Sequence, residues 1–231
     1  MSLSLARRAV LAGAAAAVGL TGSVGFRPTP AGAQQVRVDA GKRLASAAIT
    51  RRVLALRELE TATKAIVRLS DADRSALSGQ LQDQINGLTS LNAKIQGDAD
   101  LATLQADANK IVTDYRVYVL TIPKARGVVV SDIELTAEDR LAKLADRLQS
   151  TIDASSKDTT RAKADLASLR AKLSAVSGAV TPLPAGLLAL QPAGYPGNRT
   201  TLEQDRTALR TGRAGLADAA ALARQVIADL K

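Results

Sequence analysis

The chain has 231 residues, enough for one domain whose hydrophobic core needs no disulfide bonds. It contains no cysteine and no histidine, so it lacks the usual zinc and haem ligands and the commonest general base. The formal net charge is +9, while aromatic residues make up only 2% of the chain and tryptophan is absent. A core built from Leu, Val, Ile and Ala favours close-packed helices over strands.

Residues 1–33 have the pattern of an export signal. Arg7 and Arg8 precede an apolar run from Ala9 to Val24, and Ala31-Gly32-Ala33 offers a small-x-small cleavage site. We therefore expect a mature domain of residues 34–231, secreted or associated with the cell envelope. Retention of the signal as a membrane anchor is the alternative.

The route of export stays open. The paired arginines before Val10-Leu11 resemble a twin-arginine signal, but a general secretory signal also tolerates them. No other segment approaches the roughly 20 consecutive apolar residues that a membrane-spanning helix needs. We therefore expect no transmembrane span once the signal is removed.

Apolar spacing predicts two helices in the first third of the mature chain. The first runs from about Asp39 to Leu69. Ser70 is suited to cap the second helix, which ends at Gly97. The inward positions expected in the two helices are, in order, Leu44, Ala48, Leu56, Leu59, Ala62 and Ile66, then Leu77, Leu81, Ile85, Leu88, Leu91 and Ile95.

A third helix is expected from Asp100, with Tyr115 and Val119 on its inward stripe, until Pro123 stops or kinks it. The β-branched run 128–130 is consistent with a short strand, but without a partner strand we favour the buried start of a fourth helix. That helix should reach Ile152, with a break at 134–136 left open.

A fifth helix is expected to end near Ser177. Residues 178–199, rich in Pro and Gly, then form an irregular connection that is too apolar to be a disordered linker. A last helix begins at Asn198 or Thr200. Its expected inward positions are Leu202, Leu209, Leu216, Ala220 and Ile227. The sequence thus predicts an all-α fold: an antiparallel bundle of five or six long amphipathic helices with one Pro/Gly-rich apolar connection near the C-terminus.

The residues give little support to catalysis. A di-iron bundle would need Glu-x-x-His motifs, and the chain has no histidine. The only serine–lysine cluster, Ser155-Ser156-Lys157, falls in an expected turn, where a solvated lysine is a poor base. Base-stacking aromatics are nearly absent, which argues against nucleic acid as a partner. We expect no enzyme activity and no cofactor or metal.

Two surfaces are candidates for interaction. The first helix carries a basic patch that includes Arg51, Arg52 and Arg57. The second candidate surface is the apolar connection, where Leu187, Leu188 and Tyr195 stand. Tyr118, next to Arg116, is a separate candidate contact, because Tyr and Arg are favoured at interface centres. A solvated helix face and ordinary core packing are the alternative interpretations of these residues.

Three segments of the chain together show a resemblance to a known group of proteins. Tyr115 to Lys124, the turn Tyr195-Pro-Gly-Asn198 and the Arg/Ala/Leu-rich last helix together resemble secreted α-helical, coiled-coil-like proteins of actinobacteria. That group has no assigned activity, so the resemblance implies location and fold only.

The expected function is that of an exported binding or scaffolding protein. Its partner would be an unidentified protein or, alternatively, an anionic envelope polymer or lipid surface held by the basic first helix. The sequence does not indicate an oligomeric state.

Overall fold

The structure is a computed structural model that describes residues 30–231. Residues 1–29, which hold nearly all of the expected export signal, lie outside the described residues. The expected cleavage site, residues 31–33, falls at the start of α1, which begins at residue 30.

All regular secondary structure between residues 30 and 231 is helical, which confirms the all-α prediction. The elements are α1 (Pro30–Ala65), α2 (Asp71–Gly97), α3 (Leu101–Thr113), the π-helical turn η1 (Val117–Thr121), α4 (Ile122–Asp153), α5 (Thr160–Val180), α6 (Leu183–Ala189), the 3₁₀ turn η2 (Pro192–Gly194) and α7 (Asn198–Asp229).

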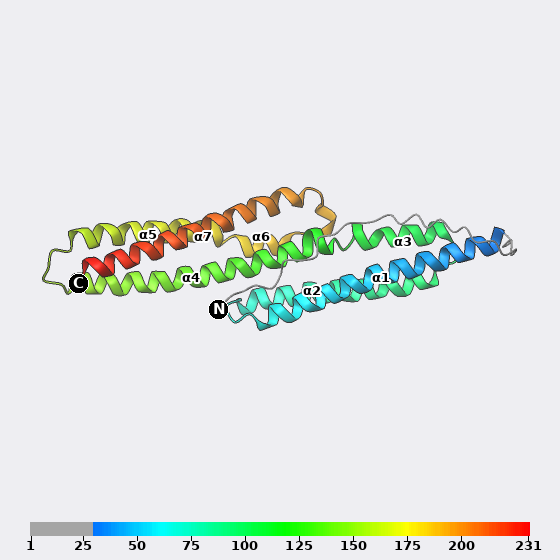
Figure 1. Cartoon of the computed structure of the whole chain (residues 1–231), viewed down its shortest axis with the longest axis horizontal. Coiled ribbons are helices and arrows are strands. Elements are labelled where there is room, and N and C mark those ends of the chain that lie inside the picture. Colours follow the sequence, from blue (N-terminus) through cyan, green and yellow to red (C-terminus); the bar gives the residue numbers. More distant parts are fainter. Residues whose placement is uncertain (1–29) are drawn as a thin grey trace, which may run out of the picture.

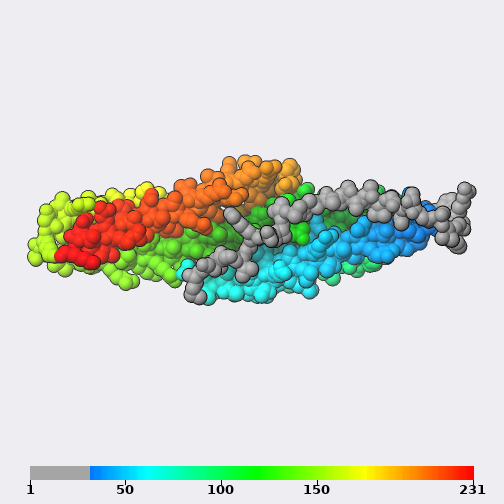
Figure 2. Space-filling model, in the orientation of Figure 1, coloured from blue at the N-terminus to red at the C-terminus, as the bar shows by residue number. Residues whose placement is uncertain are grey.

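The molecule is long and narrow (Figures 1 and 2). Helices α1, α2 and α3 pack together in one half, while α4, α5 and α7 pack together in the other. Helix α6 lies against α4 near the middle of the molecule. The buried side chains form three clusters: one among α1, α2 and α3, one at the far end of α4, α5 and α7, and one between them that includes α6.

The expected apolar stripe of α2 is correct, because all six of its positions are buried. Ser70 caps this helix as expected, its hydroxyl accepting a hydrogen bond from the backbone N–H of Asp73 at 3.1 Å. The stripe expected for α1 is wrong at Leu44, which is 72% exposed, while Ala45 is buried. Small residues face α3 here, and a Cβ on Gly41 would lie 2.6 Å from a methyl carbon of Leu104.

The third helix stops before Pro123, as one of the two expected outcomes had it, but it ends too early to carry Tyr115 and Val119 on its stripe. Helix α3 ends at Thr113, and Arg116 adopts a left-handed conformation with φ of 46°. Pro123 lies in the first turn of α4, where its missing N–H is no loss. Val119 is consequently 46% exposed. Helix α4 runs unbroken through residues 128–136, so it contains neither the alternative strand nor the break.

The connection at 178–199 is more regular than expected, because α5 extends to Val180 and α6 and η2 follow. The stripe expected for α7 is shifted, since its buried residues are Gly212, Ala219, Ala223 and Val226. Ile227 is 37% exposed. Helix α7 lies so close to α5 here that only small residues fit. A Cβ on Gly215, for example, would lie 2.7 Å from a methyl carbon of Val176.

Candidate functional site

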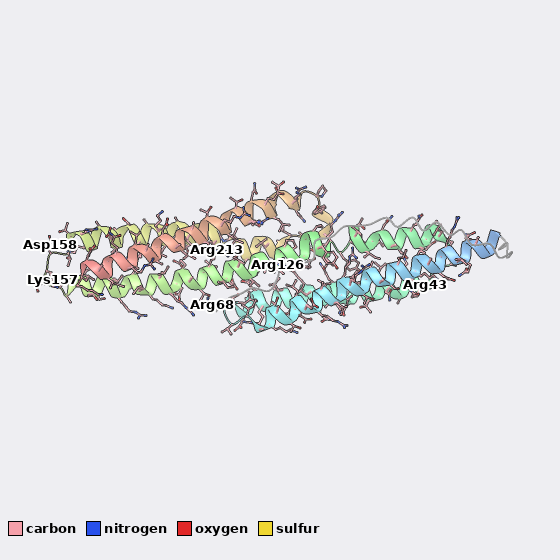
Figure 3. All side chains as sticks on the ribbon, viewed as in Figure 1. Arg43, Arg68, Arg126, Lys157, Asp158 and Arg213 are labelled. Atoms are coloured by element: carbon pink, nitrogen blue, oxygen red, sulfur yellow. The ribbon has the colours of Figure 1, made fainter. Side chains whose placement is uncertain are left out.

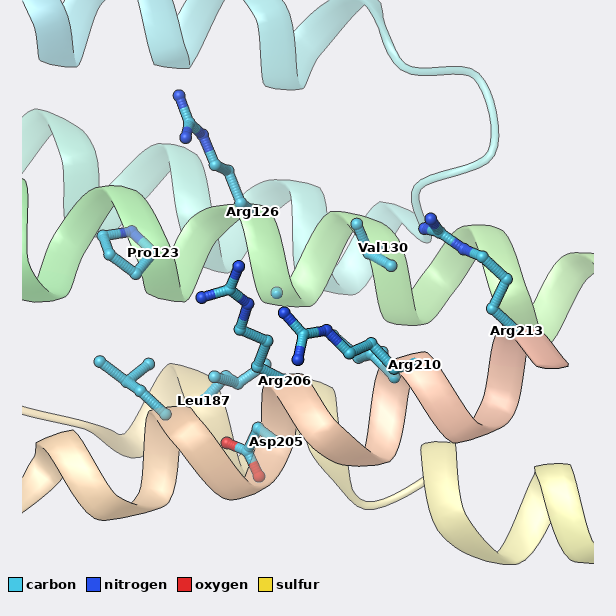
Figure 4. Close-up of a pocket in the computed structure, with 11 residues that line it drawn as sticks. Pro123, Arg126, Val130, Leu187, Asp205, Arg206, Arg210 and Arg213 are labelled. Carbon is cyan, nitrogen blue, oxygen red and sulfur yellow. The ribbon is translucent and has the colours of Figure 1, made fainter. Parts of the chain in front are cut away.

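A groove of about 490 Å³ lies where α4, α6 and α7 meet (Figure 4). Its apolar lining consists of Pro123, Gly127, Val130, Leu187, Leu202 and Leu209. Its charged lining consists of Arg126, Asp205, Arg206, Arg210 and Arg213. The groove thus combines an apolar surface with four guanidinium groups, at the middle of the molecule where Figure 3 labels Arg126 and Arg213.

The spacing of the arginines on α7 explains why they gather. Arg206, Arg210 and Arg213 are separated by four and three residues, so one face of the helix carries all three. Arg206 and Arg210 extend from α7 toward α4, and Arg126 comes from α4 itself (Figure 4). The guanidinium groups of Arg206 and Arg210 thus lie together over the groove, whereas the side chain of Arg126 points away from α7 (Figure 4) and adds its positive charge on the α4 side.

Three of these arginines have no ion-pair or hydrogen-bond partner among the described residues, namely Arg126, Arg206 and Arg210, and all three are exposed. Arg213 differs, because its Nε lies 3.6 Å from Oε1 of Glu134. The groove therefore carries positive charge that the described part of the protein does not neutralise.

Glu134 is a buried carboxylate next to this groove. Its side chain is 5% exposed, and neither carboxylate oxygen accepts a hydrogen bond. Burial raises the pKa of Glu134, and the charge of Arg213 opposes that rise. Gly212 leaves room for the carboxylate, since a Cβ there would lie 2.7 Å from Oε2 of Glu134. Arg213 is thus engaged with an acid of the protein, whereas the other three arginines are free to meet a ligand.

Asp205 is the one acidic residue in the lining of the groove. It is half-buried, and burial raises the pKa of its carboxyl group. A raised pKa means that the site disfavours negative charge on Asp205 itself. Its carboxylate therefore offsets only part of the positive charge that the arginines supply.

The basic patch expected on the first helix lies in the other half of the molecule. Arg51 and Arg57 are exposed on α1. Arg52 is half-buried, and its guanidinium carbon lies 5.3 Å from the centre of the Tyr118 ring. The structure thus brings Arg52 and Tyr118 together, but none of these residues lines the groove.

The residues expected to interact from the apolar connection are in three different settings. Leu187 is buried and lines the groove. Leu188 is partly buried in the central core. The ring of Tyr195 lies under the guanidinium of Arg116, whose central carbon is 4.4 Å from the ring centre.

A buried lysine, which the sequence did not single out, fixes the connection in place. Lys124 is 4% exposed, and its Nζ donates to Oε1 of Gln80 at 2.7 Å and to the carbonyl of Leu190 at 3.0 Å. Gln80 in turn donates to the carbonyl of Leu188 at 3.1 Å. Burial lowers the pKa of Lys124. These bonds hold the end of α6 against α2 and α4, and so position Leu187 in the groove.

Residues 30–231 contain no group of three or more acidic side chains placed to hold a metal ion. Within the same range, no helix is both long and apolar enough to cross a lipid bilayer. No protein-family model matches the chain, and no curated protein or solved structure is significantly similar to it. The groove therefore has to be interpreted from its own chemistry.

The sequence alone does not indicate this groove, although it contains part of the pattern that forms it. The positions of Arg206, Arg210 and Arg213 predict a shared helix face. The contribution of Arg126 was not readable, because 80 residues separate it from Arg206. Leu187 was the only expected interaction residue that the structure places in the groove lining.

Proposed function

We propose that this chain is an exported, non-catalytic binding protein of the cell envelope or the extracellular space, and that it binds an anionic ligand in the groove between α4, α6 and α7. In this proposal an antiparallel bundle of helices, with the apolar connection closing one side of the site, serves as a rigid frame. The observation that carries the proposal is the set of three unpaired arginines, Arg126, Arg206 and Arg210, beside an apolar surface.

The chemistry of arginine favours an anion in this place. The planar guanidinium group donates several hydrogen bonds in a fork that matches carboxylate and phosphate oxygens. Leu187 and Leu209 exclude water from part of the lining, which strengthens the electrostatic attraction. Because the arginines project from long helices, the backbone that carries them is already ordered before a ligand binds.

The composition of the lining favours binding over catalysis. The eleven residues that line the groove include no hydroxyl, thiol or amine side chain to act as a nucleophile. Arginine does not release its proton in proteins, so the four guanidinium groups cannot act as bases. Asp205 alone titrates, and a single carboxyl group without a partner supports no acid–base pair.

A second candidate keeps the basic first helix as the binding surface. Residues 37–68 carry 8 basic against 3 acidic residues, and Arg51 and Arg57 are exposed. This face suits an extended anionic polymer or a lipid surface, whose attraction would be purely electrostatic. The two candidates use different residues, so separate variants distinguish them.

The test is native mass spectrometry of the full chain after incubation with an envelope extract. Three variants are compared with the wild type: Arg206→Gln/Arg210→Gln, Arg51→Gln/Arg57→Gln, and the control Arg224→Gln, which changes an exposed arginine of α7 outside the groove. We expect a small anionic species on the wild type and the control, and its loss from the groove variant.

Each result has a definite meaning. Equal retention by the groove variant and the wild type contradicts the groove proposal. Loss of an anionic polymer from the first-helix variant alone, with release at high salt, supports the second candidate. A protein partner retained at high salt by all variants points to scaffolding at some other surface.

A further inference from the structure

We infer that the ligand of the groove is a single-chain amphiphile whose head is a phosphate monoester. This inference rests on the proposed function, because it names the class of anion that the arginine groove would bind. Three features of the site carry it: the amount of unneutralised charge, the position of the apolar surface beside that charge, and the size of the cavity.

The charge of the site calls for a head with more than one negative charge. Arg206 and Arg210 reach over the groove, and Arg126 stands on α4 with its side chain pointing away from them (Figure 4). Together they place three positive charges at or near the site that no described residue pairs with. Asp205 offsets at most one of them, while Arg213 is balanced by Glu134. A phosphate monoester carries about −1.5 to −2 at neutral pH and offers three acceptor oxygens. A carboxylate or sulfonate head, with a single charge, would leave the site positively charged.

The apolar surface runs beside the arginines along the same helix. Leu202 and Leu209 are seven residues apart on α7, which corresponds to a strip about 10 Å long. Val130 from α4 and Leu187 from α6 line the same cavity. A free phosphate ion would leave this strip unused, whereas a short alkyl chain attached to the phosphate would cover it. Each methylene group that the strip buries should tighten binding roughly fourfold.

The size of the cavity suits a ligand with one chain. Its volume of about 490 Å³ lies in the lower half of the range of about 300–1,000 Å³ that is typical of ligand pockets. Leu187 closes the cavity on the α6 side, held there by the hydrogen bonds of Lys124 to Gln80 and to the carbonyl of Leu190. A lipid with two chains would have to displace this wall.

Isothermal titration calorimetry of the full chain tests the inference with four probes of defined chemistry. Octyl phosphate has both the head and the chain, inorganic phosphate lacks the chain, octyl sulfonate carries a single charge, and octyltrimethylammonium carries a positive charge. We expect octyl phosphate to bind at least about tenfold more tightly than inorganic phosphate or octyl sulfonate. We expect no saturable binding of the cation.

Variants separate the contributions of head and chain. Arg206→Gln should weaken octyl phosphate binding by roughly tenfold. Leu202→Asn should remove most of the advantage of octyl phosphate over inorganic phosphate, and Val130→Asn provides a second test from α4. Arg224→Gln is the matched control and should bind as the wild type does. Circular dichroism of each variant checks that the helices are intact.

The outcomes distinguish this inference from the function on which it rests. Equal affinity for octyl phosphate and inorganic phosphate, with both weakened by Arg206→Gln, overturns the amphiphile inference and leaves an anion-binding groove. Equal affinity for octyl sulfonate and octyl phosphate overturns the argument for a doubly charged head. Failure of every anionic probe to bind overturns the inference and the proposed function together.

Discussion

Arg74 provides a quantitative test of how the first two helices are joined. It lies in the first turns of α2, and its guanidinium group donates to four backbone carbonyls at the end of α1 and in the following turn, namely those of Thr63, Lys64, Ile66 and Leu69, at 2.9–3.2 Å. Carbonyls at a helix C-terminus lack partners within the helix. The carbonyls of Thr63 and Ile66 also accept backbone N–H groups, from Ile66 and Leu69, each at 3.3 Å. Replacement of Arg74 by Ala therefore leaves only the carbonyls of Lys64 and Leu69 to water or to no partner.

The expected cost follows from burial. Hydrogen bonds from a charged donor contribute about 1.5–3 kcal/mol each when buried, and much less where water replaces the donor. Thr63 and Leu69 are buried, while Lys64 is exposed and the Arg74 side chain is 25% exposed. The bond to the carbonyl of the buried Leu69 therefore counts fully and the other three count less, so we expect Arg74→Ala to lower the free energy of unfolding by about 2–4 kcal/mol.

Urea unfolding followed by circular dichroism measures this change. Arg68→Ala is the control, because Arg68 is an exposed arginine of the same turn (Figure 3). Arg74→Lys should fall between wild type and Arg74→Ala, since an ammonium group cannot fork toward four carbonyls. A cost for Arg74→Ala within about 0.5 kcal/mol of the Arg68 control would refute the assignment of Arg74 as the cap of α1.

Three further predictions follow from the described contacts. Burial raises the pKa of Glu134, so above the unfolded-state pKa of about 4.3 the folded protein keeps a proton that the unfolded chain has lost, and stability falls as the pH rises through that window. Glu134→Gln should reduce this fall. If the difference in the free energy of unfolding between pH 4 and pH 7 is the same in the variant and the wild type, the prediction is wrong. Gly212→Ala would place a Cβ 2.7 Å from Oε2 of Glu134 and should cost about 1–3 kcal/mol in urea unfolding, whereas Gly178→Ala, with open space around it, should gain about 0.5–1 kcal/mol. The guanidinium carbon of Arg52 lies 5.3 Å from the centre of the Tyr118 ring. A double-mutant cycle of Arg52→Gln and Tyr118→Ala should give a coupling free energy of about 0.5–1 kcal/mol, as for a cation–π pair at an exposed site. A coupling free energy of zero would mean that this contact contributes no stability.

The sequence predicted some elements well because a single physical signal determined them. Helix α2 has six large apolar residues on one stripe and a serine cap, and all of these proved correct. The expected stripes of α1 and α7 are correct only in part, because the tightest contacts of these helices use small residues, although Leu56 is buried and Leu209 and Leu216 pack against the core. Gly41 lets Leu104 approach, and Gly215 lets Val176 approach. Small residues add almost nothing to a hydrophobic pattern. The prediction therefore placed the neighbouring large leucines on the inward face instead.

The candidate site was readable only in part for a similar reason. The spacing of Arg206, Arg210 and Arg213 defines a basic helix face without reference to any other element. Whether that face meets solvent or lines a cavity depends on where α4 and α6 lie. Their positions beside α7 are set by the turn at Arg116 and by the connection before α7. Such long-range placement leaves no periodic trace in the sequence.

The order of the three buried clusters along the molecule also has a consequence for motion. The cluster among α1, α2 and α3 and the cluster at the far end of α4, α5 and α7 share no buried residue, and the central cluster lies between them. Each end can therefore open locally while the other stays folded. In native-state amide hydrogen exchange, we expect the two ends to form separate cooperative units. The groove lies beside the central cluster, so a bound ligand should slow exchange most in the first third of α4 and the first half of α7.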